Sequence, residues 1–170
     1  MIKKWILTIF TIIIFYILQT TLFQHIMLAH VVPNLLIIIT ASTGYISGRR
    51  DALITGLICG LISDCIFGSL IGVHALIYML VGYMSGYTHY TYSDNDIILP
   101  ILYIGAADIV YGFMYYIFEF LLRGRLSFLF YLRTIILPEA LYTVLIGIVL
   151  YKLYSVVYRV FVRKNSREAI

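Results

Sequence analysis

Six long apolar segments, separated by short polar or glycine-containing stretches, make up most of the chain. They cover residues 5–24, 33–48, 52–67, 73–89, 97–122 and 133–158. An apolar run that approaches the ~20 residues needed to cross a hydrocarbon core predicts a transmembrane helix. The pattern therefore predicts an all-α, polytopic membrane protein with about six transmembrane helices. We expect one membrane domain over residues 1–158 and a basic cytoplasmic tail over residues 159–170.

The overall composition excludes a soluble domain. Mean hydropathy is +0.99, 62% of the residues are hydrophobic and only 12% are charged. A soluble domain of this size needs many more polar side chains to cover its surface. The net charge of +4 is typical of a membrane protein that holds Lys and Arg at its cytoplasmic face. No basic, aromatic-lined groove accompanies this charge, so we expect no nucleic-acid partner.

The distribution of basic residues predicts the orientation in the membrane. Six spans place both chain ends on one side, together with Lys3, Lys4, Arg49, Arg50, Arg159, Arg163, Lys164 and Arg167. The positive-inside tendency makes that side the cytoplasm. No small-residue cleavage site follows the first apolar segment, so we expect it to stay in the membrane. Arg123, Arg125 and Arg133 fall on the outer side, where anionic headgroups or a partner's carboxylates would bind them.

Glycines are concentrated in the middle of the chain. Eight of the twelve form four G-x-x-x-G pairs, which are Gly44/Gly48, Gly56/Gly60, Gly68/Gly72 and Gly82/Gly86. Residues four apart share a helix face, and two glycines there leave a groove that admits another backbone. The spacing predicts helix packing or partner binding at Gly56, Gly60, Asp64, Gly68, Gly72, Gly82 and Gly86. Two of the pairs also repeat a five-residue pattern, G-Y-x-S-G, at residues 44–48 and 82–86.

Three polar side chains in the apolar segments predict a polar pocket. Asp64 continues the Gly56, Gly60 spacing, His74 follows ten residues later and Asp108 lies well inside the fifth segment. A carboxylate inside a membrane is costly unless it is solvated, protonated or paired. For Asp64, a hydrogen-bonding network and a site for a ligand or partner helix both remain open. For Asp108 and Glu139 we expect a buried network.

No constellation of catalytic residues emerges from the chain. An intramembrane aspartyl protease needs two carboxylates that share a proton, and Asp64 and Asp108 are expected at different depths. Ser47 and Ser85 do not lie in the G-x-S-x-G pattern of hydrolases. The four histidines have no metal-ligand spacing. We therefore expect no enzyme, no cofactor and no metal site.

The glycine-rich region, taken with its flanking residues, resembles the MreD family of rod shape-determining membrane proteins. The matching strings are Pro33-Asn34-Leu35-Leu36, Arg49-Arg50, Gly56-Leu57-x-x-Gly60-Leu61-x-x-Asp64, Gly68-x-x-x-Gly72-x-x-Ala75-Leu76-x-Tyr78 and Val81-Gly82-Tyr83-x-x-Gly86. Leu137-Pro138-x-Ala140-Leu141-Tyr142 is similar to the C-terminal region of that family. Glu139 departs from the family pattern, in which a small residue is expected.

The resemblance implies a function and a set of partners. It implies a non-enzymatic component of the cell-wall elongation machinery in the bacterial cytoplasmic (inner) membrane. Such a component would bind the bitopic protein MreC, and through it associate with MreB, RodA and a penicillin-binding transpeptidase. It also implies a fold like that of the substrate-binding subunits of energy-coupling-factor transporters.

Two alternative functions remain at this stage. The first is a vitamin-binding subunit of an energy-coupling-factor transporter. Such subunits couple through an A-x-x-x-A face on their first helix, and residues 5–24 contain no alanine. The second is a small lipid-handling enzyme, which would need a paired acid–base motif at a membrane interface.

Overall fold

The protein is almost entirely helical in the part that a computed structural model describes, which comprises residues 2–27, 31–67, 72–93, 96–121 and 128–163. The α-helices are α1 (Ile2–His25), α2 (Leu35–Ser47), α3 (Arg49–Phe67), α4 (Val73–Ser85), α5 (Ile98–Tyr115), α6 (Phe128–Tyr131) and α7 (Leu137–Tyr158). A 3₁₀ segment, η1 (Gly86–Thr91), and three π segments, η2 (Tyr116–Leu121), η3 (Leu132–Ile136) and η4 (Arg159–Arg163), extend or join them.

Helices occupy the positions of all six predicted segments, but they differ in length. Three helical stretches are long and apolar enough to cross a membrane: Lys4–His25, Ile98–Phe118 and Phe128–Phe161. Helix α2 is apolar but has only 13 residues. Helix α4 also has 13 residues, although η1 continues it. The structure is therefore all-α with three long apolar helices and a group of shorter ones.

Some helices begin or end at other residues than the apolar segments do. The basic stretch at residues 49–51, which lies between two apolar segments, forms the first turn of α3, because Gly48 alone makes the bend, with φ at 90°. The last helical stretch starts at Phe128 rather than at residue 133. Residues expected in the C-terminal tail are helical as far as Arg163.

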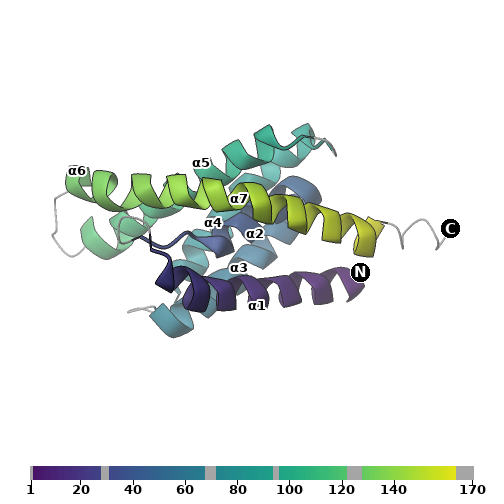
Figure 1. Cartoon of the computed structure of the whole chain (residues 1–170), viewed down its shortest axis with the longest axis horizontal. Coiled ribbons are helices and arrows are strands. Elements are labelled where there is room, and N and C mark those ends of the chain that lie inside the picture. Colours follow the sequence, from purple (N-terminus) through teal and green to yellow (C-terminus); the bar gives the residue numbers. More distant parts are fainter. Residues whose placement is uncertain (1, 28–30, 68–71, 94–95, 122–127, 164–170) are drawn as a thin grey trace.

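A π-helical turn carries the last helix past a proline. Pro138 has no N–H to donate, and its ring clashes with the carbonyl of the preceding turn. The π segment η3 (Leu132–Ile136) lies directly before it, so the helix widens there and then continues as α7. The result is one long helical rod, which Figure 1 shows along the whole molecule.

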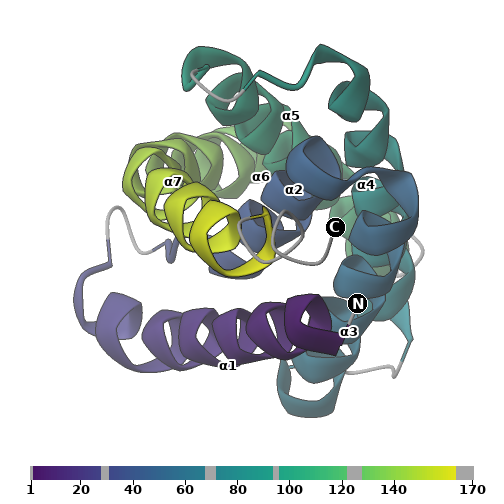
Figure 2. The ribbon, with the colours of Figure 1, turned by 90° about the vertical axis from the view of Figure 1, so that its right-hand side faces the viewer.

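Helix α2 forms the centre of the bundle. Every residue from Leu35 to Ile46 is buried. It contacts α1, α3, α4, α5 and α7, and Figure 2 shows it surrounded by them. A helix without a polar face is suited to this position, because no side of it needs water. The Thr40 and Thr43 hydroxyls donate to carbonyls one turn earlier, which satisfies them inside the bundle.

Helix α1 lies at the edge of the bundle. It buries Thr8, Ile12, Phe15 and Phe23, while most of its other apolar side chains are exposed. A salt bridge joins Lys4 to Asp51, so the start of α1 lies beside the start of α3. The start of α1 also contacts η4, which places both described ends of the chain at one end of the molecule (Figure 1).

Candidate functional site: a glycine-packed helix pair and two separate carboxyl sites

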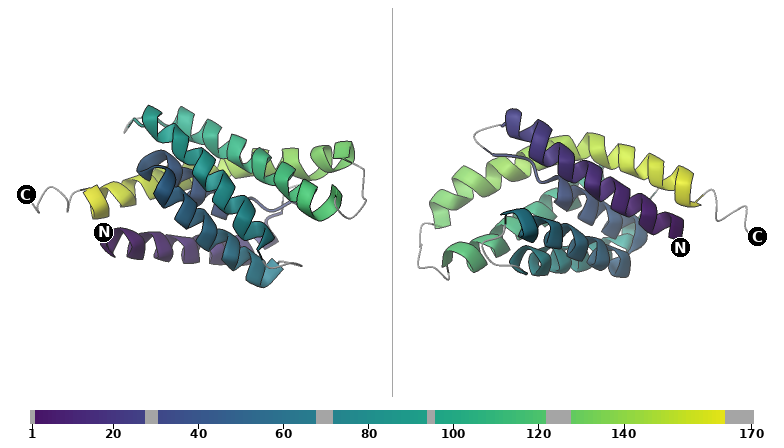
Figure 3. Two further views of the ribbon diagram at one scale, coloured as in Figure 1. Left: turned by 180° about the vertical axis from the view of Figure 1, so that it is seen from behind. Right: turned by 90° about the horizontal axis from the view of Figure 1, so that it is seen from below.

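Helices α3 and α4 meet through glycines on both sides of their contact. They run antiparallel, side by side, in Figure 3. A Cβ added at Gly56 would lie 2.2 Å from the Tyr78 carbonyl oxygen, and one at Gly60 would lie 2.3 Å from Ala75 Cα. Both distances are far below van der Waals contact, so any side chain there would push the helices apart.

The opposite helix offers two more glycines to the same contact. A Cβ at Gly82 would lie 2.3 Å from the Ala52 carbonyl oxygen, and one at Gly86 would lie 2.3 Å from Arg49 Cα. The G-x-x-x-G pairs at 56/60 and 82/86 therefore face each other's helices. We call these four residues the glycine contact.

The repeated G-Y-x-S-G segments also pack on each other. A Cβ at Gly44, near the end of α2, would lie 2.9 Å from the backbone carbon and the Cβ of Ser85 at the end of α4. The repeat thus joins the ends of α2 and α4 next to the glycine contact. Close approach at two helix ends is a sufficient reason for the repeated pattern.

Asp64 closes the other end of the α3–α4 pair. Its Oδ2 accepts hydrogen bonds from the backbone N–H groups of Gly72 and Ala75, both at 2.9 Å. Its Oδ1 accepts one from the backbone N–H of His74 at 3.0 Å and contacts His74 Nδ1 at 3.0 Å. The first N–H groups of a helix have no partner in the helix itself, and an acidic group also suits its positive end. Asp64 therefore caps α4 from α3.

This geometry bears on the two interpretations left open for Asp64. The side chain has no exposed surface, and each carboxylate oxygen already has two partners. No lone pair is left for a ligand. The structure thus favours the hydrogen-bonding role. Gly72 begins α4 with φ at 108°, and the remaining predicted residue of this turn, Gly68, lies outside the described residues.

Asp108 has different neighbours from Asp64 and His74. It lies on α5, is only 3% exposed, and has the Thr143 side chain of α7 next to it. The His74 ring also packs 5.1 Å from the Tyr115 ring on α5. Of the three residues of the predicted polar pocket, Asp64 and His74 are in direct contact at the start of α4, whereas Asp108 lies beside Thr143 on α7.

A polar junction at the start of α2 also includes Thr143. Asn34 Oδ1 accepts hydrogen bonds from the Ile37 backbone N–H at 3.2 Å and from the Tyr78 hydroxyl at 2.7 Å. The Asn34 N–H donates to the Thr143 hydroxyl at 3.0 Å, and Gln19 accepts from the next backbone N–H, that of Leu35, at 3.0 Å. Side chains from α1, α4 and α7 thus hold the beginning of the central helix.

Sequence reasoning missed the face of α5 that carries Asp108. Gly105 and Gly112 flank it, and Cβ atoms there would lie 2.8 Å from Val144 and 3.0 Å from Ile136. The spacing of these glycines around the aspartate is a helix-face signal that was available in the sequence. The approach of Val144 and Ile136 to this face was not available, because it depends on how α5 packs on the last long helix.

The basic end of the molecule is organised by tyrosines. The Arg49 guanidinium lies 4.2 Å from the centre of the Tyr87 ring and donates a 2.8 Å hydrogen bond to the Tyr90 hydroxyl. The Tyr90 hydrogen bond raises the pKa of Arg49 above its ordinary value. Arg133, predicted on the other side, is exposed on η3, and Arg123 and Arg125 lie outside the described residues.

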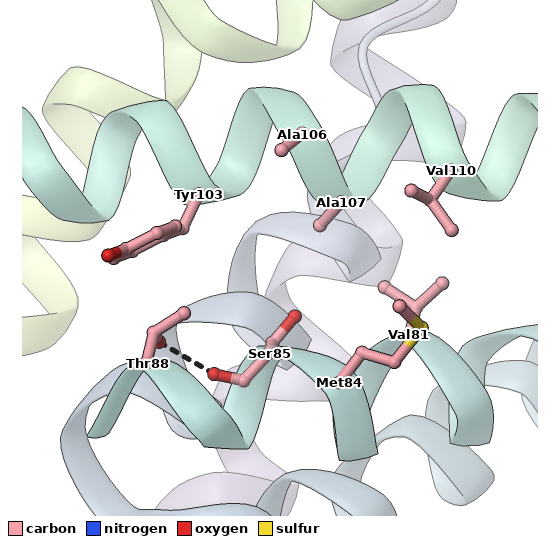
Figure 4. Close-up of a pocket in the computed structure, with 8 residues that line it drawn as sticks. All are labelled: Val81, Met84, Ser85, Thr88, Tyr103, Ala106, Ala107 and Val110. Atoms are coloured by element: carbon pink, nitrogen blue, oxygen red, sulfur yellow. Dashed lines mark hydrogen bonds between the residues drawn. The ribbon is translucent and has the colours of Figure 1, made fainter. Parts of the chain in front are cut away.

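Pockets open on the helix surfaces at several places. A groove of about 740 Å³ lies between α1 and α7 and is lined mainly by apolar side chains, including Phe10, Ile14 and Leu153. A smaller pocket of about 150 Å³ lies between α4 and α5, where Figure 4 shows Val81 and Met84 opposite Val110. A third, of about 180 Å³, lies between Asp96 and the end of α7. None of these pockets is lined by a predicted site residue. Among the described residues, no three His, Cys, Asp or Glu side chains gather to hold a metal ion.

Comparison with known proteins identifies the family. The family described as rod shape-determining protein MreD matches residues 1–161. No curated protein and no solved structure matches the chain. The match gives no support to the vitamin-transporter alternative. Because it covers nearly the whole chain, which has helices apolar enough to cross a membrane, this protein belongs to the MreD family and acts in the rod shape-determining system.

Proposed function

We propose that this protein is a non-enzymatic membrane component of the complex for bacterial cell shape and cell-wall elongation, where it binds the bitopic protein MreC. Through MreC it associates with MreB, RodA and a penicillin-binding transpeptidase, and so helps to organise peptidoglycan synthesis. The observation that carries this proposal is the family match over residues 1–161. The packed interior supports it, because four glycines and a capping carboxylate form a rigid scaffold rather than an open reaction site.

The proposed topology has six spans in the bacterial inner membrane with both termini in the cytoplasm. Three observations support it. The start of α1 contacts η4, the Lys4–Asp51 salt bridge brings the start of α3 to the same end, and Asp96 lines a pocket there with Arg159. Alkaline phosphatase fused after Leu122 is expected to be active, whereas fusions after Asp96 or at the C-terminus are expected to be inactive. Activity of the C-terminal fusion would contradict the topology.

We propose the groove between α1 and α7 as the binding site for the transmembrane helix of MreC. One wall, α1, is mostly exposed, so it can shift to admit a helix more easily than the central elements can. Its lining residues on α1 extend from Ile6 to Phe15, which is about 14 Å along a helix axis. An apolar groove of this length suits two to three turns of a single apolar helix.

Affinity purification tests the proposal. The tagged protein would be extracted from its own membranes in mild detergent, and the captured proteins identified by mass spectrometry. We expect MreC in near-equal amount. Capture of a pair of ATPases with a long-helix membrane subunit, in place of MreC, would instead indicate a vitamin transporter.

A matched pair of variants tests the groove separately. Leu153 lines the groove, whereas Val149, one turn earlier on α7, does not, and both are exposed. Leu153→Trp fills the groove and is expected to lower captured MreC about fivefold, equivalent to about 1 kcal/mol of binding free energy. Val149→Trp is expected to leave capture unchanged. If both variants capture as much MreC as the wild type does, MreC does not bind in this groove. The proposal that the protein binds MreC would be unaffected by that result.

A further inference from the structure

A cavity with three charged side chains lies between the start of α5 and the end of α7. Figure 1 shows both of these helix ends at the end of the molecule where the chain termini lie. The cavity has a volume of about 180 Å³, which is room for several water molecules. Asp96, just before α5, lines it together with Lys152 and Arg159. The two cations are seven residues apart along one helix, so they share a face of it.

The charges in this cavity are not paired with each other. Neither of the two ion pairs in the described part of the chain includes Asp96, Lys152 or Arg159, so their charged atoms lie more than 4.0 Å apart. Arg159 Nε donates to the carbonyl oxygen of Ser155 at 3.4 Å, and this is the one hydrogen bond that the three charged groups make with described residues. Opposite charges that line one cavity without touching leave space for a ligand between them.

One edge of the cavity is apolar and faces the membrane. Ile97 and Val156 line it, and they are 39% and 46% exposed. The cavity also lies where the predicted apolar segment 97–122 begins and the segment 133–158 ends, which is the boundary between hydrocarbon and water. Long basic side chains place their charged heads at such a boundary. A ligand there has its charged group in the cavity and its apolar part beside the helices.

The charges of the cavity specify the headgroup. A phosphodiester accepts hydrogen bonds from Lys152 and Arg159, and a primary ammonium donates hydrogen bonds to the Asp96 carboxylate. Phosphoethanolamine carries both groups, two carbons apart. A phosphoglycerol headgroup has no cation for Asp96, and the trimethylated nitrogen of phosphocholine has no N–H to donate. The three headgroups therefore differ at the contact with Asp96.

We propose that this cavity binds the headgroup of one phosphatidylethanolamine molecule. The lipid joins the start of α5 to the end of α7 and neutralises the three charges between them. The proposed six-span topology places it in the cytoplasmic leaflet. The inference is independent of the proposed binding to MreC, since every residue of the cavity belongs to this chain.

Native mass spectrometry of the purified, delipidated full-length protein tests the proposal. Dioleoyl lipids with phosphoethanolamine, phosphoglycerol or phosphocholine headgroups are added separately, at equal concentration, in the same detergent. We expect one phosphatidylethanolamine per chain, bound about tenfold more tightly than either other lipid, because one hydrogen bond between charged groups is gained. Glycerophosphoethanolamine, the headgroup without acyl chains, is expected to bind far more weakly. Equally tight binding of this compound would overturn the assignment to a lipid.

Variants test whether the charged side chains make the contacts. Asp96→Asn is expected to abolish the preference for phosphoethanolamine over phosphoglycerol, whereas Arg159→Gln should weaken binding of both lipids. Arg50→Gln removes an exposed cation that does not line the cavity, so it should change neither. Equal binding of all three lipids to the wild type would overturn the proposal, and that comparison needs no variant. A preference that survives Asp96→Asn would overturn it as well.

Discussion

The Gly60→Ala substitution gives the sharpest test of how the α3–α4 pair is built. The new Cβ would lie 2.3 Å from Ala75 Cα, 2.6 Å from Ala75 N and 2.6 Å from the His74 carbonyl oxygen. All three are backbone atoms, so no side-chain rotation relieves the clash. Ordinary contact begins at 3.4 Å, so the helices must separate by about 1 Å at this point.

The separation also weakens the cap on α4. The Ala75 and His74 N–H groups that Asp64 binds belong to the same residues that Gly60 contacts. Overpacking typically costs about 1–3 kcal/mol, and a lengthened bond to a charged group adds about 1 kcal/mol or more. The higher helix propensity of alanine offsets about 1 kcal/mol of this loss in the free energy of unfolding. We therefore expect a net loss of about 1–3 kcal/mol in the free energy of unfolding.

Gly147→Ala provides the matched control. This glycine also lies buried in a helix, α7, but a Cβ there would meet only side chains, those of Ile104 at 3.5 Å and Ile38 at 3.9 Å, both ordinary contact distances. The same gain in helix propensity applies without the clash, so stability should stay equal or rise slightly. The two variants therefore separate close backbone approach from the general effect of replacing a helical glycine.

Unfolding in a mild detergent, titrated with a denaturing detergent and followed by far-UV circular dichroism, measures both variants against the wild type. The expected order of stability is Gly147→Ala at or above wild type, with Gly60→Ala clearly below. If Gly60→Ala is as stable as Gly147→Ala, the α3–α4 distance seen here does not depend on the glycine, and the reasoning is refuted.

Three further predictions concern single polar or backbone features, each measured by the same unfolding assay. Asp64→Asn should lower the free energy of unfolding by about 1–2 kcal/mol, because its one amide oxygen keeps part of the four-partner cap. Asp64→Leu keeps none of it and should lower that free energy by about 3 kcal/mol or more. Equal losses in the two variants would point to charge rather than hydrogen bonding. Tyr78→Phe should cost about 1 kcal/mol, since it removes the 2.7 Å hydrogen bond to Asn34 Oδ1, and a variant as stable as wild type would show that another donor replaces the hydroxyl. Gly48→Ala should lower the free energy of unfolding by about 1–2 kcal/mol, because φ is 90° at this residue and alanine is strained there. The Cβ itself has room, since its nearest neighbour is His89 at 3.6 Å. An unchanged stability would argue against strain in this turn.

The sequence by itself determined where the helices form and which faces of them meet. Apolar runs depend on local composition, so all six segments became helical, and the glycine pairs at 56/60 and 82/86 share helix faces by periodicity alone. The order of these motifs also pointed to the family, which the match over residues 1–161 confirms. Boundaries were less certain where one residue decides them, as Gly48 does at the start of α3.

Only the tertiary structure decided what the acidic side chains do. Asp64 and Asp108 are both single carboxylates in apolar segments, each on a helix face that carries two glycines. The difference arises because the start of α4 brings three backbone donors to Asp64, whereas Asp108 is buried between α5 and α7, where no backbone N–H reaches its oxygens. Hydrogen bonds and charge interactions depend on the three-dimensional positions of groups far apart in the chain, and helical periodicity alone does not specify them.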